Sequence, residues 1–489
     1  MEKQGFADDF KRRIRETKTT RWIRFGIVSL LFLLWVVWMR TWWLAVFELL
    51  LFDIYITGYI PFTWWKKSKS KFVRSVMSWV DAIVYALILV YFIFSFVGQN
   101  YQIPSSSLEK TLLTGDYLWV NKFVYGPRVP ITPVHFPLVH NTLFGHKSYL
   151  DNPSTEYRRL KGLRNVEEGD IVVFNFPAGD TVATKFEETP QYYDLLVKQY
   201  GRDAVNTNKA VFGDVIYRPV DRRQNFVKRC VALPGQRLKI VNDTLYINGE
   251  IREFPKNVQF NYLYSTSSPM TDADLKELGI SLTDLSEIEP GTPSRVNLKP
   301  FLPNTPDNAR VYISPLTAGM IAKMKASGKI KDYIKFNKLV TYFEGNDFTS
   351  MVFPYGENGD WTLSNYGGEK GLLIPAKGTT IELTPDNWTI YQRAIRNYEG
   401  HSDAYLDPVT QRVMIDGQPA DTYTFAMDYY WMMGDNRDNS QDSRFWGFVP
   451  EDHIVGTPMI VLASFDRERG LFDGKIRFDR ILRSANPDK

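Results

Sequence analysis

Serine and lysine residues at two points of the chain could together carry out nucleophilic chemistry. Three serines, Ser105 to Ser107, follow a proline in the run YQIPSSSLEKTLL, and Lys228 lies in the run NFVKRCVALPG. A serine hydroxyl is a weak nucleophile unless a neighbouring base accepts its proton. The five histidines are scattered and none stands in a setting that suggests a triad. A lysine is therefore the candidate base.

A lysine can accept a proton near neutral pH only if its pKa is lowered. Moving that pKa from about 10.4 to about 7–8 means a preference for the neutral amine on the order of 4 kcal/mol, and burial among apolar groups is its usual source. If NFVKRCVALPG is a strand, Phe226, Lys228 and Cys230 share one face and Arg229 lies on the other. Lys228 then has apolar neighbours, while Arg229 is expected to be a solvated or salt-bridged charge.

A second lysine lies closer in sequence to the serines. Ser107 and Lys110 fit the S-x-x-K spacing, which places serine and lysine one helical turn apart in penicillin-recognising enzymes. That geometry needs a helix through Lys110, yet Thr114-Gly115-Asp116 interrupts the chain and a strand-like YLWV run follows. The K-T-G sequence that accompanies this motif is absent. An acyl-serine enzyme that uses Lys110 remains the alternative.

The run MGDNRDNSQDSRFWGFVP, residues 433–450, is rich in Asp, Asn, Arg and Ser, which bond to one another and to turning backbone. A calcium loop starting at Asp438 would need glycine at its sixth position and glutamate at its twelfth, where Ser443 and Val449 stand. His135, His140 and His146 are read as ordinary loop histidines. The sequence predicts neither a metal nor a cofactor.

The elements that must position these residues begin with apolar segments near the N-terminus. Residues 25–39 are uncharged, residues 42–60 are mostly apolar, and residues 76–97 are long enough to cross a hydrocarbon core of about 30 Å. The first two segments, which together make up residues 25–60, predict either two tilted spans or a helical hairpin that turns at Arg40 and Thr41. The last segment predicts a transmembrane helix.

Charge placement predicts the orientation of these segments. Basic side chains concentrate in residues 1–24 and in the loop 61–75, and such stretches remain in the cytoplasm. The rest of the chain, from about residue 98, would then lie on the extracytoplasmic side. A net charge of +4 on 59 basic and 55 acidic residues gives no reason to expect a nucleic-acid partner.

Beyond the membrane segments, short alternating runs separated by turn residues predict a mainly β domain. One hairpin is expected to turn at Asn242 and Asp243. We expect the domain to comprise residues 98–250 and 425–489, with residues 251–424 as an inserted second domain that contains one helical candidate, ADLKELGI. The Pro-rich apolar loop 127–150 predicts either a substrate or lipid contact or a long packed excursion, and the sequence leaves this open.

Four blocks in order resemble the bacterial type I signal peptidases, membrane-bound Ser/Lys endopeptidases. The blocks are IPSSSLEKTLLTGDYLWVNKFVYG, GDIVVFNFP, VKRCVALPG, and GDNRDNSQDSR with WGFVP. Ser106 stands where the family often has glycine, and Leu108-Glu109-Lys110 replaces a more common Met-x-Pro. The resemblance implies a mainly β, signal-peptidase-like fold anchored by N-terminal transmembrane helices. The expected insert, residues 251–424, exceeds the family's usual intervening domain.

The same resemblance implies a role for each matching residue. Ser107 corresponds to the nucleophile and Lys228 to the general base. Ser105 would complete the oxyanion hole, and Ser440 would orient the lysine by a hydrogen bond. Asp442, Arg444 and Arg229 would support the site. The shallow apolar pockets for the first and third residues before the cut would be lined by Tyr101, Ile103, Pro104, Leu108 and Val227.

The function implied is removal of N-terminal signal peptides from exported preproteins after small residues of the Ala-x-Ala kind, through an acyl-enzyme. The implied partners are preproteins, the lipid bilayer and the secretion translocon. The implied location is the bacterial cytoplasmic membrane, which the chain crosses more than once with its catalytic domain outside. A non-catalytic membrane-anchored assembly factor with the same fold is the alternative from another class.

Overall fold

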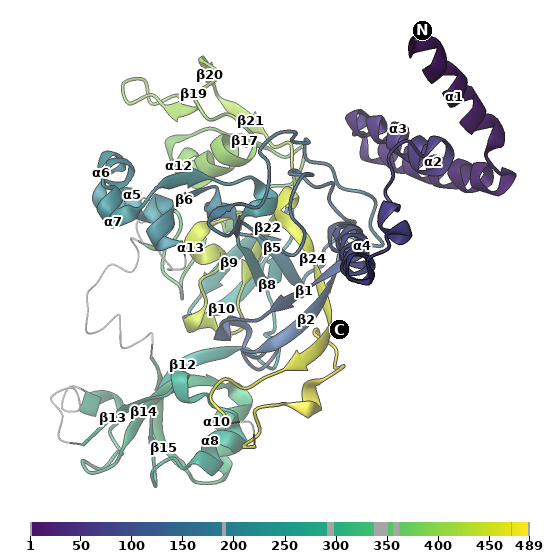
Figure 1. The fold of residues 1–489 in the computed structure, drawn as a ribbon. Coiled ribbons are helices and arrows are strands. Elements are labelled where there is room, and N and C mark those ends of the chain that lie inside the picture. Colours follow the sequence, from purple (N-terminus) through teal and green to yellow (C-terminus); the bar gives the residue numbers. More distant parts are fainter. Residues whose placement is uncertain are drawn as a thin grey trace. The chain divides into compact units, whose positions relative to one another are not determined.

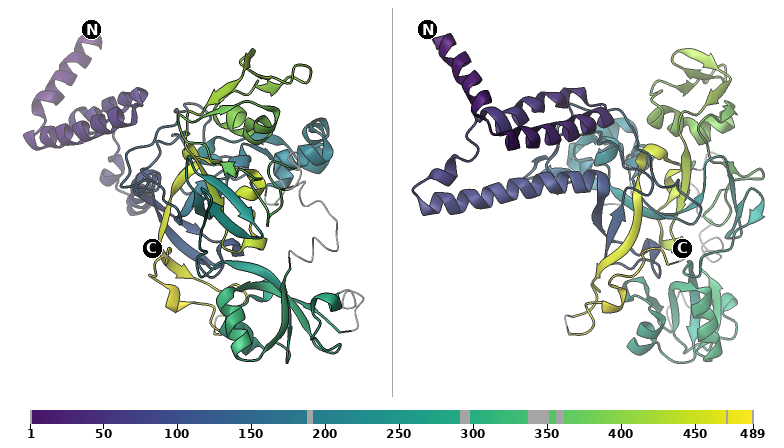
Figure 2. Two further views of the ribbon diagram at one scale, coloured as in Figure 1. Left: turned by 180° about the vertical axis from the view of Figure 1, so that it is seen from behind. Right: turned by 90° about the vertical axis from the view of Figure 1, so that its right-hand side faces the viewer.

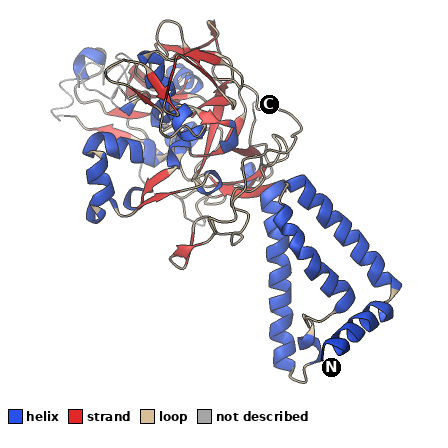
Figure 3. Ribbon diagram, turned by 90° about the horizontal axis from the view of Figure 1, so that it is seen from above, coloured by secondary structure: helices blue, strands red, loops and turns tan. Residues whose placement is uncertain are grey.

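A computed structural model describes residues 2–187, 192–290, 298–336, 351–355, 361–470 and 472–487. The chain divides into two compact units. The first comprises residues 1–94 and 129–157, and the second comprises residues 95–128 and 158–489. Figure 1 shows that the elements before β1 are helices, and Figure 3 shows the long N-terminal helices in blue and the strands of the rest of the chain in red. The Pro-rich loop thus belongs with the N-terminal helices, which the sequence did not indicate.

Two helices of the first unit are long and apolar enough to cross a membrane, Thr19–Met39 and Lys71–Val97. Between them, residues 42–57 form consecutive short helical segments rather than a third long helix. The helices of this unit are α1 (Glu2–Glu16), α2 (Thr19–Met39), α3 (Phe47–Phe52) and α4 (Lys71–Phe92), and α4 continues as a wider helical turn to Val97.

The segment 42–57 forms a helical hairpin with α2, which is one of the two alternatives that the sequence left open. Arg40 ends α2 in a left-handed conformation, so the chain reverses at Arg40 and Thr41. The guanidinium of Arg13 donates a 2.8 Å hydrogen bond to the carbonyl of Thr57, and Arg21 donates one of 3.1 Å to Ile54. The end of the hairpin therefore returns to the region where α2 begins.

The second unit is built on a seven-stranded antiparallel sheet. Successive side chains along each strand point to opposite faces of the sheet, and the apolar ones pack into a separate cluster on each face. Phe226 and Cys230 face one core and Val227 faces another, as the period of two predicted. In spatial order the strands are β1 (Gly98–Gln102), β2 (Asp116–Asn121), β24 (Ile454–Ser464), β5 (Ile171–Asn175), β8 (Asn225–Ala232), β22 (Tyr429–Met433) and β23 (Val449–Pro450).

A smaller sheet continues from β8 through the predicted hairpin. β9 and β10 are joined by Asn242 and Asp243, which have φ of 49° and 68°. Positive φ at both central residues is the two-residue turn that matches strand twist, and Asn and Asp tolerate it. The sheet contains β11 (Glu250–Ile251), β10 (Thr244–Ile247), β9 (Arg237–Val241) and β16 (Leu372–Leu373).

The expected insert, residues 251–424, is not a single body among the described residues. One part is a four-stranded sheet with helices and has apolar clusters of its own (Figure 2). The predicted helix ADLKELGI is confirmed as α8. These elements are β13 (Ser286–Ile288), β14 (Val311–Thr317), β12 (Gln259–Thr266), β15 (Ile330–Lys335), α8 (Asp272–Leu278) and α10 (Ala318–Ala326).

The other part of the expected insert, from residue 352 onward, shares a core with strands of the seven-stranded sheet. Phe353 and Trp388 lie in one apolar cluster with Val231 of β8 and Trp431 of β22. This region is therefore continuous with the catalytic domain. Its elements are β17 (Thr380–Glu382), α12 (Pro385–Arg393), β18 (Tyr405–Leu406), β19 (Val413–Ile415), β20 (Gln418–Ala420) and β21 (Thr422–Thr424).

The remaining elements are short. A helical excursion separates β5 from β8, and a small hairpin lies in the Pro-rich loop. They are β3 (Thr142–Leu143), β4 (His146–Lys147), β6 (Thr181–Ala183), α5 (Tyr193–Tyr200), α6 (Arg202–Thr207), α7 (Lys209–Phe212), β7 (Val215–Tyr217) and α13 (Ser443–Trp446).

Candidate active site

Ser107 and Lys228 meet although 121 residues separate them. The Lys228 ammonium Nζ lies 2.6 Å from the Ser107 Oγ, and both residues are buried, 3% and 6% exposed. Ser107 lies in a single helical turn, Ser106–Leu108, and Lys228 lies in the middle of β8. A hydroxyl within hydrogen-bond reach of an amine is the geometry that proton transfer needs.

The surroundings of Lys228 favour its neutral form. Burial lowers the pKa of Lys228 to about 8, although the carboxylates of Asp442 and Asp435 act in the opposite direction. The ring of Phe226, two residues back on the same face, has its centroid 5.7 Å from Nζ. The amine is therefore close to the protonation state that a general base requires near neutral pH.

The other lysine points elsewhere. The helical turn at the serines ends at Leu108, and Lys110 has a φ of 71°, so the two residues are not one helical turn apart. The Lys110 ammonium donates hydrogen bonds to the carbonyls of Leu278, at 3.0 Å, and of Gly279. The S-x-x-K geometry is not formed.

Arg229, on the opposite face of β8, is fully buried and not solvated. Its guanidinium donates two hydrogen bonds to the Asp435 carboxylate, of 2.8 and 2.7 Å, and a third of 2.9 Å to the carbonyl of Gly169. Asp435 also accepts a 2.7 Å bond from the Thr111 hydroxyl. This bidentate pair links β8 to the loop after β22 and to the segment that follows Ser107.

A second buried pair supports the loop itself. Arg444 donates to both oxygens of Asp442 at 2.9 and 2.8 Å, and Asp442 also accepts a 3.0 Å bond from the backbone of Gly434. The carbonyl of Ser107 accepts a 3.1 Å bond from the backbone N–H of Asn436. The loop thus holds the main chain of the nucleophile directly.

Ser440 and Ser105 occupy different environments. Ser440 is buried, but its hydroxyl has no hydrogen-bond partner among the described residues, so the expected bond to Lys228 is not formed. A methyl group added at Gly434 would lie 2.2 Å from the Ser440 Oγ and 2.6 Å from the Ser107 carbonyl oxygen, which places Ser440 beside the nucleophile's main chain. Ser105 is exposed, with its Oγ 3.5 Å from the Ser107 Oγ.

The residues expected to line the substrate pockets gather in one apolar cluster, with one exception. Ile103 and Leu108 are buried, and Tyr101 and Val227 pack against the same cluster. Pro104 is exposed. β1, which carries Tyr101, is at the edge of the seven-stranded sheet. An edge strand beside an apolar wall can accept an extended peptide.

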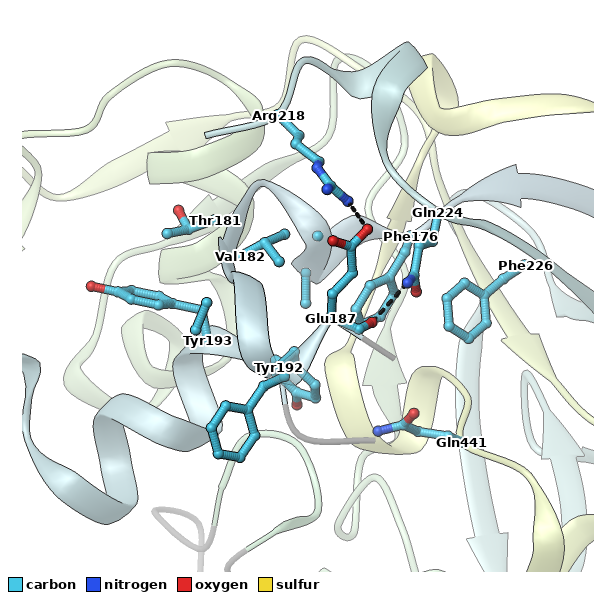
Figure 4. A pocket seen from close by; sticks show the side chains of 14 residues that line it. Phe176, Thr181, Val182, Glu187, Tyr192, Tyr193, Arg218, Gln224, Phe226 and Gln441 are labelled. Atoms are coloured by element: carbon cyan, nitrogen blue, oxygen red, sulfur yellow. Dashed lines mark hydrogen bonds and ion pairs between the residues drawn. The ribbon is translucent and has the colours of Figure 1, made fainter. Parts of the chain in front are cut away.

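A pocket that no sequence motif predicted opens between the excursion that follows β5, the start of β8 and Gln441 (Figure 4). The lining of the pocket includes Phe226, two residues before Lys228, and Gln441, which follows Ser440. Glu187, which lines the pocket, forms a 2.6 Å ion pair with Arg218, and its carbonyl accepts a 2.7 Å hydrogen bond from the Gln224 side chain. Glu187 and Arg218 come from the excursion between β5 and β8, which carries no motif.

Comparisons with known proteins identify the family of the chain. The family model "Signal peptidase, peptidase S26" matches residues 76–279 and 373–463, more than half of the chain. Signal peptidase I of Buchnera aphidicola (subsp. Acyrthosiphon pisum) is 23% identical over 420 residues, covering 85% of this chain and 82% of that protein. The Haemophilus influenzae enzyme is 22% identical over 418 residues, covering 85% and 78%.

A further relative is more similar over a shorter stretch. Signal peptidase I of Aquifex aeolicus is 64% identical over 205 residues, covering 32% of this chain and 78% of that protein. The residues between the two matched segments, 280–372, include β13, β14 and β15, so the additional sheet lies largely outside the shared part. On these matches the chain belongs to the signal peptidase family, peptidase S26, and is a serine endopeptidase of that family.

Proposed function

We propose that this enzyme removes signal peptides from exported preproteins by a Ser107–Lys228 dyad that forms an acyl-enzyme. The observation that carries the proposal is the 2.6 Å contact between the Lys228 amine and the Ser107 hydroxyl inside a buried, partly aromatic niche. The relatives carry the name signal peptidase I, which supports preproteins as the substrate class.

In the first step, neutral Lys228 accepts the proton of the Ser107 hydroxyl while the oxygen attacks the carbonyl carbon of the scissile peptide. The tetrahedral intermediate carries a negative oxygen, which the Ser107 backbone N–H and the nearby Ser105 hydroxyl would stabilise. Its collapse breaks the C–N bond, and Lys228 returns the proton to the leaving amine. The signal peptide is then held as an ester on Ser107.

In the second step, a water molecule hydrolyses the ester. Lys228 accepts a proton from the water, whose oxygen adds to the ester carbonyl, and then returns that proton to the Ser107 oxygen as it leaves. The same amine therefore acts as base and acid in both halves of the reaction. Ser440, beside the main chain of Ser107, is proposed to restrict the position of the lysine.

Recognition is proposed to use the free edge of β1. The extended end of a signal peptide would add to this edge by main-chain hydrogen bonds, while its side chains face the cluster that contains Ile103, Leu108 and Val227. Because Ile103 and Leu108 are already buried in this cluster, small residues of the Ala-x-Ala kind are the ones expected to fit against it. Pro104, which is exposed, would lie at the rim of this surface.

The N-terminal helices support a multi-pass arrangement in the bacterial cytoplasmic membrane. α2 would cross outward, residues 42–57 would return beside it, and α4 would cross outward again. Both basic stretches, residues 1–24 and 61–75, then lie in the cytoplasm, and the catalytic unit lies outside. This places the dyad on the side where preproteins emerge from a translocon, which we propose as a transient partner.

The experiment that tests the dyad is cleavage of an exported preprotein by the detergent-solubilised enzyme. Ser107→Ala and Lys228→Met are expected to reduce kcat/KM by at least about three orders of magnitude. Each substitution removes one of the two groups that must act together, the nucleophile or its base. Lys110→Met is the matched control and is expected to stay within a few-fold of the parent, since Lys110 binds backbone carbonyls. An inactive Lys110→Met with an active Lys228→Met would contradict the proposal.

A further inference from the structure

The Pro-rich loop is attached to the membrane-spanning part of the chain. Residues 129–157 form one compact unit with residues 1–94, while the flanking residues belong to the catalytic unit. The Tyr91 hydroxyl, near the end of α4, donates a 2.9 Å hydrogen bond to the carbonyl of Pro133. The rings of Tyr91 and His135 are stacked at a tilt, with centroids 5.0 Å apart. The loop is therefore held at the level of Tyr91.

The loop is an ordered two-stranded ribbon. Phe136 donates its backbone N–H to Ser148 at 2.7 Å, and Leu150 donates to Val134 at 3.0 Å. The bridge between His135 and Tyr149 lies between these two pairs. Residues opposite each other in such a ribbon point to the same side. One side thus carries His135 and Tyr149, which face α4, and the other carries Val134, Phe136 and Leu150.

Exposed apolar side chains lie on the side of the ribbon that faces away from α4 and at its tip, where His146 and Lys147 are exposed as well. Phe144, at the turn between β3 and β4, is 92% exposed, and Leu138 is 64% exposed. Large apolar side chains scattered singly over a surface are ordinary, but a contiguous set on one element indicates an interaction surface. This surface consists of Val134, Phe136, Leu138, Phe144 and Leu150.

The position of Tyr91 along its helix gives the depth at which the base of the ribbon, residues 133–135, is held. The helix from Lys71 to Val97 has 27 residues, which is about 40 Å at 1.5 Å per residue and equals the thickness of a bilayer with its headgroups. Tyr91 lies six residues before the end of that helix, roughly 9 Å along its axis. That is close to the boundary between headgroups and hydrocarbon, where tyrosine side chains collect.

We propose that the ribbon 134–150 inserts its tip and outer side into the extracytoplasmic leaflet of the bilayer. Lipid is the occupant we assign, because the ribbon lies against a membrane-spanning helix at the depth of the headgroup boundary. The insertion would fix the ribbon at the membrane surface as a second anchor beside α4. This inference needs α4 to span the membrane, but it does not depend on the roles of Ser107 and Lys228.

The test is a measurement of depth with a single fluorescent label. Phe144→Cys and Leu150→Cys are each labelled with an environment-sensitive NBD maleimide in the full chain, which is reconstituted into phosphatidylcholine–phosphatidylglycerol vesicles. The one native cysteine, Cys230, is fully buried, and the unsubstituted protein gives the background. Val409→Cys is the matched control, since Val409 is 87% exposed on the connection between β18 and β19.

We expect labels at positions 144 and 150 to emit at shorter wavelength than the label at Val409. Lipids that carry a doxyl quencher high on the acyl chain should quench them, whereas iodide present on both sides of the membrane should quench only the control. Strong iodide quenching at both ribbon positions would overturn the proposal. Blue-shifted labels that doxyl lipids do not quench would also overturn it, because they would indicate that protein covers the ribbon.

Discussion

The buried amine of Lys228 makes activity depend on pH in a defined direction. Its pKa is lowered to about 8 by burial, and only the neutral form can accept the proton of Ser107. We therefore expect kcat/KM to rise with pH and to level off above about 8. A pH profile measured with a peptide substrate checks this, and a profile that keeps rising to the ordinary lysine value of 10.5 would contradict it.

The same burial lowers the free energy of unfolding while Lys228 is protonated. An ion pair, by contrast, would raise it. Below pH 8 the unfolded chain and the folded chain both hold the proton, and the folded chain holds it in an apolar niche. Between about 8 and 10.5 the unfolded chain binds more protons, so stability rises with pH across this window. The total cost below the window is about 3 kcal/mol at most.

Lys228→Met is therefore expected to be more stable than the parent at pH 7, by up to about 3 kcal/mol in the free energy of unfolding. The difference should shrink as the pH rises from 8 toward 10.5, because the parent then loses its buried charge. Denaturant unfolding at several pH values measures it. A difference that does not change with pH would show that packing, rather than the charge, decides the effect.

At the scale of elements, the alternation of apolar residues was enough to predict the strands that carry the site. The run around Lys228 gave the correct faces of β8, and Asn242 with Asp243 gave the correct turn. These predictions depend on local geometry alone. The partners of the acidic loop could not be predicted in this way, because Asp435 meets Arg229 and Asn436 meets Ser107 only through the fold.

Gly434 directly follows β22 and begins the loop 434–442. At this residue the loop approaches the helical turn that carries Ser107 very closely. A Cβ there would lie 2.2 Å from the Ser440 Oγ and 2.6 Å from the Ser107 carbonyl oxygen. The backbone of Ser107 cannot retreat without breaking its bond to Asn436. The absence of a side chain at Gly434 therefore sets the position of the nucleophile.

Gly434→Ala is expected to lower kcat by roughly a hundredfold or more, because a displacement of about 1 Å at a reacting group has this effect. Gly319→Ala is the matched control, since a Cβ in α10 would meet only the Thr317 hydroxyl, at 3.8 Å, and alanine favours a helix. Preprotein cleavage, with circular dichroism to verify folding, makes the comparison. Near-normal kcat in Gly434→Ala would mean that the dyad tolerates a shifted Ser107.

At the scale of the whole molecule, the sequence predicted the anchor and the catalytic sheet but not how residues 251–424 are divided. Composition changes little along this region, so nothing local indicates that Phe353 shares a core with Trp431 while Tyr264 belongs to a separate cluster. The separate sheet nevertheless contacts the site: the backbone of Asn261 donates a 2.7 Å bond to Asp438. Its α8 receives the bonds from Lys110.

The structure of segment 42–57 could not be predicted from composition either, because it depends on the hydrogen bonds of Asp53. The segment is mostly apolar, yet it consists of short helical pieces, and Asp53 closes the last of their turns. The Asp53 carboxylate accepts hydrogen bonds from the Thr57 hydroxyl and from the backbone of Tyr59 and Ile60. With Arg13 bound to the Thr57 carbonyl, this closure returns the chain to the end where α2 begins.

This return makes a prediction about sidedness that labelling can check. If the hairpin brings the chain back to the cytoplasm and α4 then crosses the membrane, Ser68 and Val409 lie on opposite sides. A membrane-impermeant maleimide added to intact spheroplasts should label Val409→Cys at once and should label Ser68→Cys only after lysis, while the parent, with Cys230 buried, stays unlabelled. Equal labelling of both variants before lysis would exclude the topology, because the positive charges at residues 66–74 would then face outward together with the catalytic unit.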